Sequence, residues 1–131
     1  MNETVREWIA KANRDLATAR RESQATDEPN HDAVCFHSQQ SIEKLLKALL
    51  IQRGSPAPRL HDLAELGRLV GAVCPGWSWP IEELRFLSRA AVEFRYPGES
   101  ATRDDAARCL DIATHMGASL LPLLQERREG L

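Results

Sequence analysis

The sequence predicts an all-α protein, folded as an up-and-down bundle of four to five antiparallel helices. Apolar residues recur at steps of three and four in five successive segments, as one buried face of a helix requires. No segment alternates strictly between apolar and polar residues, which is the pattern typical of a half-buried strand. The chain has 131 residues and no internal repeat. Residues 1–131 are therefore expected to form a single domain.

Two long helices are predicted at the start of the chain. The first runs from Thr4 to about Gln24, because Thr4 and Glu7 form a capping-box pattern. The second follows a polar, proline-containing loop and runs from about Asn30 to Arg53, where Gly54 favours a helix end. The apolar stripe of the first consists of Val5, Ile9, Ala12, Leu16 and Ala19, and that of the second of Cys35, Ile42, Leu45, Leu46, Leu49 and Leu50.

Two shorter helices are predicted next. One begins near His61–Asp62, after a proline-rich connector, and ends at Cys74. The other has Pro80 at its first turn and ends at Arg95–Tyr96, because Pro97 disfavours a helical conformation in the residue before it.

The last predicted helix starts at Thr102, with Asp105 three residues further on. Its small residues Ala106, Ala113 and Gly117 indicate a close contact with a neighbouring helix. Pro122 falls inside the apolar pattern and is expected to kink this helix or to end it early.

Composition and charge exclude several classes of protein. The formal net charge of −2 argues against a generally basic nucleic-acid-binding protein. The apolar runs are only a few residues long, whereas a membrane-spanning helix needs about 20. The acidic first residues, followed by an amphipathic pattern, do not resemble a signal peptide. We therefore expect no membrane association and a cytoplasmic location.

The sequence offers no recognisable metal or cofactor motif. The three cysteines Cys35, Cys74 and Cys109 are far apart, as expected for reduced thiols in a cytosolic protein, and no CxxC pair suggests zinc. A glycine-rich phosphate loop, GxSxG, HExxH and a paired-metal carboxylate motif are also missing from the sequence. Neither a metal nor a cofactor is expected, and a self-contained metabolic enzyme is disfavoured.

One stripe of the second predicted helix collects polar side chains suited to a phosphate or to an acidic partner surface. It consists of His37, Gln40, Lys44 and Lys47, spaced by three and four. The alternative is a solvated face, with Glu43 pairing with Lys47 at i,i+4. A binding stripe would leave both lysines facing one groove with Arg95, whereas a structural stripe would scatter them into separate salt bridges.

His61 and Asp62 stand where the third predicted helix begins. The favoured interpretation is structural: Asp62 interacts with the helix dipole and His61 caps the helix. In the alternative, His61 approaches His37 across the short loop, but a metal pair would then require an added carboxylate.

The segment 94–98 holds Arg95 and Tyr96 at a helix end, where Pro97 and Gly98 fix the backbone. A rigid helix end is a good place to present an arginine to a phosphate. It is equally a helix stop whose tyrosine packs on the core, and both interpretations remain open here.

Arg108 and His115 offer a second arginine–histidine combination, suited in principle to phosphodiester cleavage. They lie seven residues apart on the last predicted helix, about 10 Å along its axis. At that separation they do not readily reach one phosphate, so we interpret them as exposed polar residues.

Five blocks of sequence carry a resemblance that covers nearly the whole chain. They are residues 7–12 with 15–16 and 19–20, residues 35–48, His61–Asp62–Leu63 with Leu66, residues 94–97, and the alanine-rich start of the last helix. Together they resemble the HEPN domain family (higher eukaryotes and prokaryotes nucleotide-binding). The resemblance implies an up-and-down helical bundle, a homodimer, and a small nucleotidyltransferase partner in a toxin–antitoxin pair. Many members of the family are metal-independent ribonucleases.

The chain departs from the ribonuclease members at one point. Those members carry an arginine, four to six residues and then a histidine at the turn before the last helix. Arg95 matches the arginine by position, but Ser100, Ala101 and Thr102 occupy the places for the histidine. His37 or His61 could replace it only if the fold brings one of them beside Arg95.

Two functions from different classes follow from this resemblance. The first is a homodimeric binding module for a nucleotide, an RNA or a nucleotidyltransferase. Its expected ligand-binding residues are His37, Gln40, Lys44, Lys47, His61, Arg95 and Tyr96. The second is a metal-independent ribonuclease toxin with Arg95 and either His37 or His61 as candidate catalytic residues. The missing histidine favours the first. A third alternative is a helical bundle that only dimerises.

Three tryptophans, Trp8, Trp77 and Trp79, give a second reason to expect a dimer. So many large rings in a small chain should leave some exposed in a monomer, and aromatic residues are enriched at interfaces.

Overall fold

Five α-helices make up the computed structural model, which describes the backbone of residues 2–129 and the side chains of residues 2–125. They are α1 (Glu3–Ser23), α2 (His31–Gln52), α3 (Leu63–Val73), α4 (Ile81–Glu93) and α5 (Arg103–Glu129). The described range contains no strand, and the predicted all-α class is confirmed. Within it, every helix is too short or too polar to cross a membrane.

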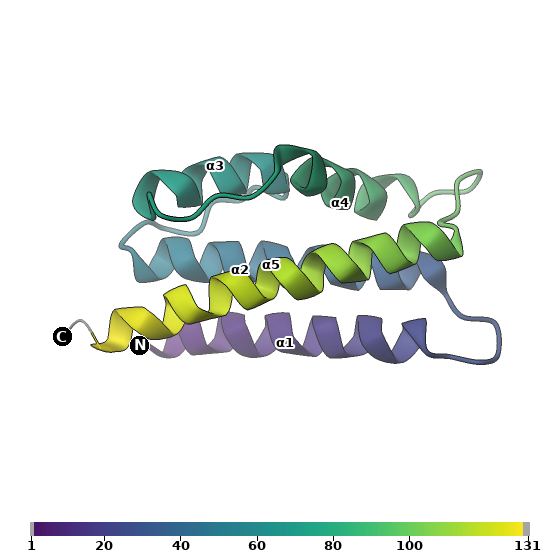
Figure 1. Cartoon of the computed structure of the whole chain (residues 1–131), viewed down its shortest axis with the longest axis horizontal. Coiled ribbons are helices and arrows are strands. Elements are labelled where there is room, and N and C mark those ends of the chain that lie inside the picture. Colours follow the sequence, from purple (N-terminus) through teal and green to yellow (C-terminus); the bar gives the residue numbers. More distant parts are fainter. Residues whose placement is uncertain (1, 130–131) are drawn as a thin grey trace.

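The second helix is the centre of the molecule, because α1, α3, α4 and α5 all pack against it. In Figure 1, α1 runs alongside α2, while α3 and α4 follow one another along another side of it. The chain enters α3 beside the middle of α2 and runs toward one end of the bundle. It then returns through residues 74–80 and continues through α4 toward the other end. This arrangement places the start of α3 and the second half of α4 over the same stretch of α2.

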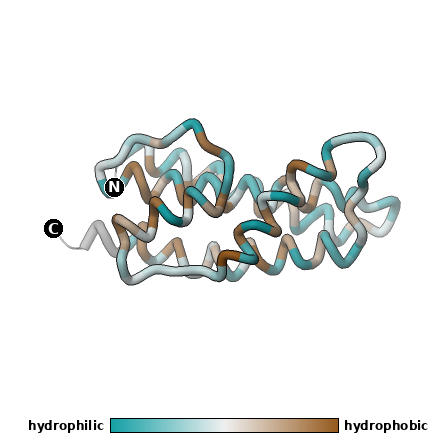
Figure 2. The backbone as a smooth tube through the Cα atoms, turned by 90° about the horizontal axis from the view of Figure 1, so that it is seen from above, coloured by the Kyte–Doolittle hydropathy of each residue, from teal (hydrophilic) through white to brown (hydrophobic). Residues whose placement is uncertain are grey.

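The central position of α2 explains its composition. A helix that is covered on several sides has to bury more than one apolar stripe. Along α2 the buried residues include Leu46 and Leu49, and they meet Leu66, Leu87 and Leu120 of the other helices in one core. Hydrophobic positions accordingly recur along the helices, while the long connections are more hydrophilic (Figure 2). The small residues Ala106, Ala113 and Gly117 of α5 are buried, as expected for a close contact.

The start of α1 differs from the prediction. The N-cap is Asn2, whose side-chain oxygen accepts a hydrogen bond from the Val5 amide at 2.8 Å, and Glu3 stands in the first turn. The predicted capping box of Thr4 and Glu7 is therefore wrong. Asn2 is itself a strong cap, so the helix begins before Thr4 and takes Thr4 into its first turn.

Pro122 does not end the last helix, since α5 continues to Glu129. A proline inside a helix costs about 3 kcal/mol, because it removes one hydrogen bond and its ring crowds the preceding turn. Leu120 and Leu124 lie on either side of Pro122, and both are fully buried. Burial of two leucines offsets a cost of that size. The prediction of an early end is wrong.

The tryptophans are less exposed than predicted. Trp77 is 8% exposed and its indole N–H donates to Ser119 Oγ at 3.0 Å. Trp79 donates to Glu83 Oε1 at 2.8 Å and, like Trp8, is half-buried. The expectation of exposed tryptophans is wrong, because the rings of all three pack against the core of the bundle. Among the described side chains, the large apolar ones that are exposed are instead Ile81, Val92 and Tyr96.

The loop between α4 and α5 is fixed at its C-terminal end, where it enters α5. Thr102 and Asp105 cap α5 reciprocally: each backbone amide donates to the other's side chain at 3.0 Å. The Ala101 amide donates to Asp32 Oδ1, at the start of α2, at 2.6 Å. This bond ties the loop that follows α4 to the central helix.

Replacing Asp32 with alanine is expected to lower the free energy of unfolding by about 1–2 kcal/mol, because the Ala101 amide loses its acceptor. Chemical denaturation measures the change. Asp32→Asn keeps a side-chain oxygen and should retain most of the stability. Equal stability of Asp32→Ala and the wild type would show that the tether contributes nothing.

Candidate functional site

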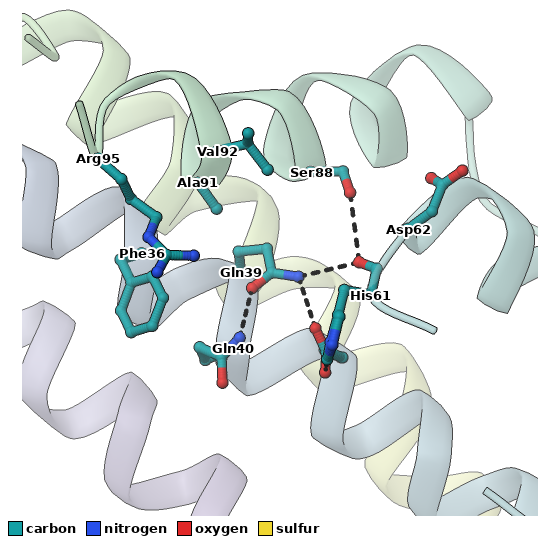
Figure 3. A pocket seen from close by; sticks show the side chains of 10 residues that line it. Phe36, Gln39, Gln40, His61, Asp62, Ser88, Ala91, Val92 and Arg95 are labelled. Carbon is teal, nitrogen blue, oxygen red and sulfur yellow. Dashed lines mark hydrogen bonds and ion pairs between the residues drawn. The ribbon is translucent and has the colours of Figure 1, made fainter. Parts of the chain in front are cut away.

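The main candidate site is a pocket of about 390 Å³ where the middle of α2 faces the start of α3 and the end of α4 (Figure 3). We call it the Arg95 pocket. A volume of this size suits a small ligand. Its lining residues are Phe36, Gln39, Gln40, Glu43, His61, Asp62, Ser88, Ala91, Val92 and Arg95. The lining is thus partly aromatic and apolar and partly polar, with Arg95 and His61 on opposite sides of Gln39 and Gln40 in Figure 3.

A buried polar group forms one wall of the pocket. The Glu43 side chain is 6% exposed, and it accepts hydrogen bonds from Gln39 Nε2 and Lys47 Nζ, both at 3.0 Å. Lys47 is equally buried, so the predicted i,i+4 pair is confirmed as an internal ion pair. We call Gln39, Glu43, Lys47 and His61 the Glu43 cluster. Separating the two charges would leave each of them buried and uncompensated, which is costly. We therefore expect this wall of the pocket to be rigid.

The carboxyl of Glu43 stays ionised because of its neighbours. Burial by itself raises the pKa of Glu43. The hydrogen bonds from Gln39, His61 and Lys47, together with the charge of Lys47, outweigh burial and hold the pKa below its ordinary value. The charged form is therefore favoured by the folded state.

This shift predicts how stability depends on pH. A carboxyl with a lowered folded pKa stabilises the fold fully above its unfolded pKa, about 4.3, and loses that contribution as the pH falls through the folded value. The difference in unfolding free energy between the wild type and Glu43→Gln should therefore shrink below about pH 4. Urea denaturation of both proteins across this range measures it. A difference that stays constant or grows on acidification would contradict the ionised cluster.

His61 is held at three points. Its Nδ1 lies 2.9 Å from Glu43 Oε2, and because a carboxylate only accepts, Nδ1 is the donor. Its backbone carbonyl accepts from Gln39 Nε2 at 3.3 Å and from Ser88 Oγ at 3.5 Å. The side chain is nevertheless 78% exposed. The ring is thus fixed in orientation, and its Nε2 remains available to a ligand.

The capping role expected for His61 is wrong. Asp62 is the N-cap of α3, and its side chain accepts from the Ala64 amide at 3.0 Å. The histidine turns toward α2 instead and donates to Glu43. A hydrogen bond to an ionised carboxylate is stronger than one to a neutral backbone group.

Arg95 lies just beyond α4, which ends at Glu93, slightly earlier than predicted. The amides of Phe94 and Arg95 donate to the carbonyls of Ala90 and Val92 and close this helix end. The guanidinium carbon stands 5.7 Å from the centre of the Phe36 ring, within the range of a cation–π contact. Among the described residues no carboxylate forms an ion pair with Arg95. Its five donors are thus open to a ligand.

The other predicted site residues lie elsewhere. His37 Nδ1 is 2.8 Å from Asp15 Oδ1 of α1, and Lys44 forms an ion pair with the other oxygen of the same carboxylate. Lys47 points into the Glu43 cluster, and Tyr96 is 62% exposed outside the pocket lining. The lysines of the predicted stripe are therefore scattered into separate salt bridges. The structure brings together Gln40, His61 and Arg95.

Several residues of the pocket were not predicted as site residues. Phe36, Gln39 and Ser88 line it, and Glu43 was expected only to pair with Lys47. The available signal was the spacing of Phe36, Gln39, Gln40 and Glu43, which share one side of a helix at steps of three and four. Ser88 left no such signal, because its place depends on the packing of α4.

Arg108 and His115 are not a site. Arg108 stacks on Phe86 at 4.0 Å from the ring centre. His115 Nδ1 lies 2.8 Å from the backbone oxygen of Asp111, within its own helix. Each has its own partner, so the sequence spacing of this pair is accidental.

The cysteines and acidic residues offer no metal site in the part of the chain that the structure describes, since no three His, Cys, Asp or Glu gather closely enough. All three cysteines are buried, and none forms a disulfide there. A hydrogen bond with Cys35, together with burial, raises the pKa of the Cys109 thiol. The thiol therefore stays protonated and unreactive.

Comparison with known proteins gives concordant results. The chain is similar in structure to TT1696 from Thermus thermophilus, with a TM-score of 0.70 and 22% identity over 97% of this chain and 99% of that one. It is also similar to ST0689, an archaeal HEPN homologue, with a TM-score of 0.68 and 24% identity over 95% of this chain and 99% of that one. At these identities the likeness shows the fold alone. No curated protein sequence matches the chain. The family model of the HEPN domain matches residues 5–118, and the chain therefore belongs to the HEPN domain family.

Proposed function

We propose that this protein is a binding module that receives a nucleotide or an RNA segment in the Arg95 pocket. One observation carries the proposal: Arg95 is exposed, makes no ion pair among the described residues, and stands over Phe36 at the edge of the pocket. A guanidinium binds a phosphate through paired hydrogen bonds. An aromatic ring beside it offers contact to a base, as in many sites for single-stranded nucleic acid.

Gln40 and His61 complete the set of groups that a nucleotide would meet. The Gln40 amide donates to Gln39 Oε1 at 2.9 Å, which leaves its own oxygen and a second N–H for a base edge or a ribose. His61 lines the same pocket, and its ring uses Nδ1 for Glu43. Glu43 holds Gln39 and His61 in place, so little ordering of this wall is needed when a ligand binds.

Titration of the full chain with fluorescently labelled single-stranded RNA, and competition with unlabelled nucleotides, tests this function. We expect saturable binding that weakens with salt, because a phosphate contact is electrostatic. Binding that is equally strong for a neutral polymer, or no binding of any nucleotide or RNA, would contradict it.

The partner proposal rests on family membership. HEPN proteins commonly pair with small nucleotidyltransferases, and we propose that this chain works beside such a partner in a toxin–antitoxin-like pair. Co-expression with a neighbouring nucleotidyltransferase, followed by purification of one tagged chain, tests the pairing. Failure of the two chains to co-purify would contradict it.

We also propose a cytoplasmic location. The cysteines are buried and form no disulfide in the described residues, which favours the reducing cytoplasm.

A metal-independent ribonuclease is the second candidate, because His61 lines the same pocket as Arg95. The Glu43–His61 pair resembles the carboxylate–imidazole arrangement of general acid–base catalysis, with Arg95 as the charge clamp. His37 is turned toward Asp15 and is less suited to this role. Inducible expression of the wild type, Arg95→Ala and His61→Gln, with growth and total RNA followed, separates the two functions. A binding module leaves RNA intact, whereas RNA loss that both substitutions abolish would establish the ribonuclease.

We also propose that the protein is a homodimer. Val92 is 57% exposed and Tyr96 62% exposed, and both flank Arg95 at the end of α4. Such apolar side chains next to a site are typical of an interface core. Sedimentation at micromolar concentration is expected to give a dimer, and the double variant Val92→Ser, Tyr96→Ser a monomer. A monomeric wild type would contradict the proposal.

A further inference from the structure

The charges that line the Arg95 pocket are few and of mixed sign. Arg95 is the one permanent cation among its lining residues, Asp62 supplies an exposed carboxylate, and the buried carboxylate of Glu43 is already paired with Lys47. The lysines of α2 do not add to the positive charge. Lys47 is bound to Glu43 at 3.0 Å with a side chain only 6% exposed, and Lys44 is bound to Asp15 on the side of α1.

This balance suits one phosphate group and no more. A guanidinium satisfies a single phosphate through two parallel hydrogen bonds. A nucleoside triphosphate carries several negative charges, which proteins usually meet with a phosphate-binding loop, a lysine and bound cations. Here the second and third phosphates would find no further lining cation and would approach the exposed carboxylate of Asp62. Like charges juxtaposed in a site weaken binding strongly.

We propose that the Arg95 pocket selects a nucleotide unit with a single phosphate group and rejects nucleoside diphosphates and triphosphates. The inference rests on the proposed function, since it takes the pocket to be a nucleotide site. Phe36 and Ala91 give the base an apolar surface, and Arg95 takes the phosphate. Two sources present this chemistry: a free nucleoside monophosphate and an internal phosphodiester of RNA.

Competition binding with the full chain, at fixed ionic strength and without divalent cations, tests the selection. The probes are the mono-, di- and triphosphates of adenosine, guanosine and uridine, together with the dinucleotides ApA, GpG and UpU. The affinity of the monophosphates or of the dinucleotides is expected to be at least about tenfold higher than that of the corresponding triphosphates. Binding by the dinucleotides alone would point to RNA as the source, and binding by the monophosphates alone to free nucleotides.

Two results overturn the inference in different ways. Affinity that rises from monophosphate to triphosphate would contradict the selection while leaving the nucleotide site in place. No binding by any of these probes, nor by longer single-stranded RNA, would overturn the proposed function as well.

A charge variant gives an independent test. Asp62→Asn removes one carboxylate from the pocket, while its amide oxygen can still accept from the Ala64 amide and cap α3. This variant should improve triphosphate binding several-fold relative to monophosphate binding. Asp104→Asn changes the net charge equally at an exposed position outside the lining and should leave that ratio unchanged. An unchanged ratio in Asp62→Asn would contradict the inference.

Discussion

Arg95→Ala is expected to weaken nucleotide or RNA binding by about tenfold or more, because it removes a charge-assisted hydrogen-bond pair with the phosphate. The melting temperature should stay close to that of the wild type. The side chain is exposed and forms no ion pair within the described residues, so the fold depends little on it. Fluorescence titration and thermal unfolding of the same preparations measure both quantities.

Arg89→Ala is the matched control for this prediction. Arg89 lies on α4 as well, 63% exposed and 3.6 Å from Glu93, and does not line the pocket. The substitution Arg89→Ala removes the same charge from the same region. It should leave the affinity for nucleotide or RNA within about twofold of the wild type, because only an exposed ion pair outside the pocket is lost. Equal losses in the two variants would mean that only the general charge of this surface matters.

Glu43→Ala is expected to lower the free energy of unfolding by about 3 kcal/mol or more, the largest effect on stability foreseen here. The substitution removes the carboxylate that pairs with the buried Lys47, and Gln39 and His61 lose their shared acceptor. Chemical denaturation measures the loss. A change below about 1 kcal/mol would place Glu43 in the range of exposed ion pairs and contradict the buried cluster.

The double variant Glu43→Leu, Lys47→Met separates the energy of the pair from the cost of breaking it. Apolar side chains of similar volume often replace a buried ion pair without loss of stability. We therefore expect this variant to be clearly more stable than Glu43→Ala. It should also bind ligand less tightly, because His61 would lose the carboxylate that orients its ring.

The local pattern of apolar residues predicted most of the fold. All five helices were expected, and their ends agree to within a few residues, since the steps of three and four depend only on the helix itself. The exceptions were decided by groups outside the pattern. Asn2 caps α1 from the preceding residue, and the burial of Leu120 and Leu124 carries α5 past Pro122.

The candidate site was only partly predictable. Gln40, His61 and Arg95 stood out as polar residues at helix faces and ends, and they meet in one pocket. His37 and Lys44 share a stripe with Gln40 in the sequence, but α2 is surrounded by other helices. Its neighbouring polar residues therefore face different partners, and Asp15 of α1 binds these two. Such pairings depend on which helices pack together, and the spacing of residues within one helix does not reveal this.

The most direct test of the nucleotide site is a nuclear magnetic resonance titration of the ¹⁵N-labelled chain with a short single-stranded RNA. We expect the amide signals that move most to belong to the walls of the Arg95 pocket, in α2 around Gln39 and Gln40, at His61, and at the end of α4. Shifts centred instead on Trp8, Lys11 and Lys44, which line a separate hollow between α1 and α2, would contradict it. A spectrum that does not change with added RNA would contradict it as well.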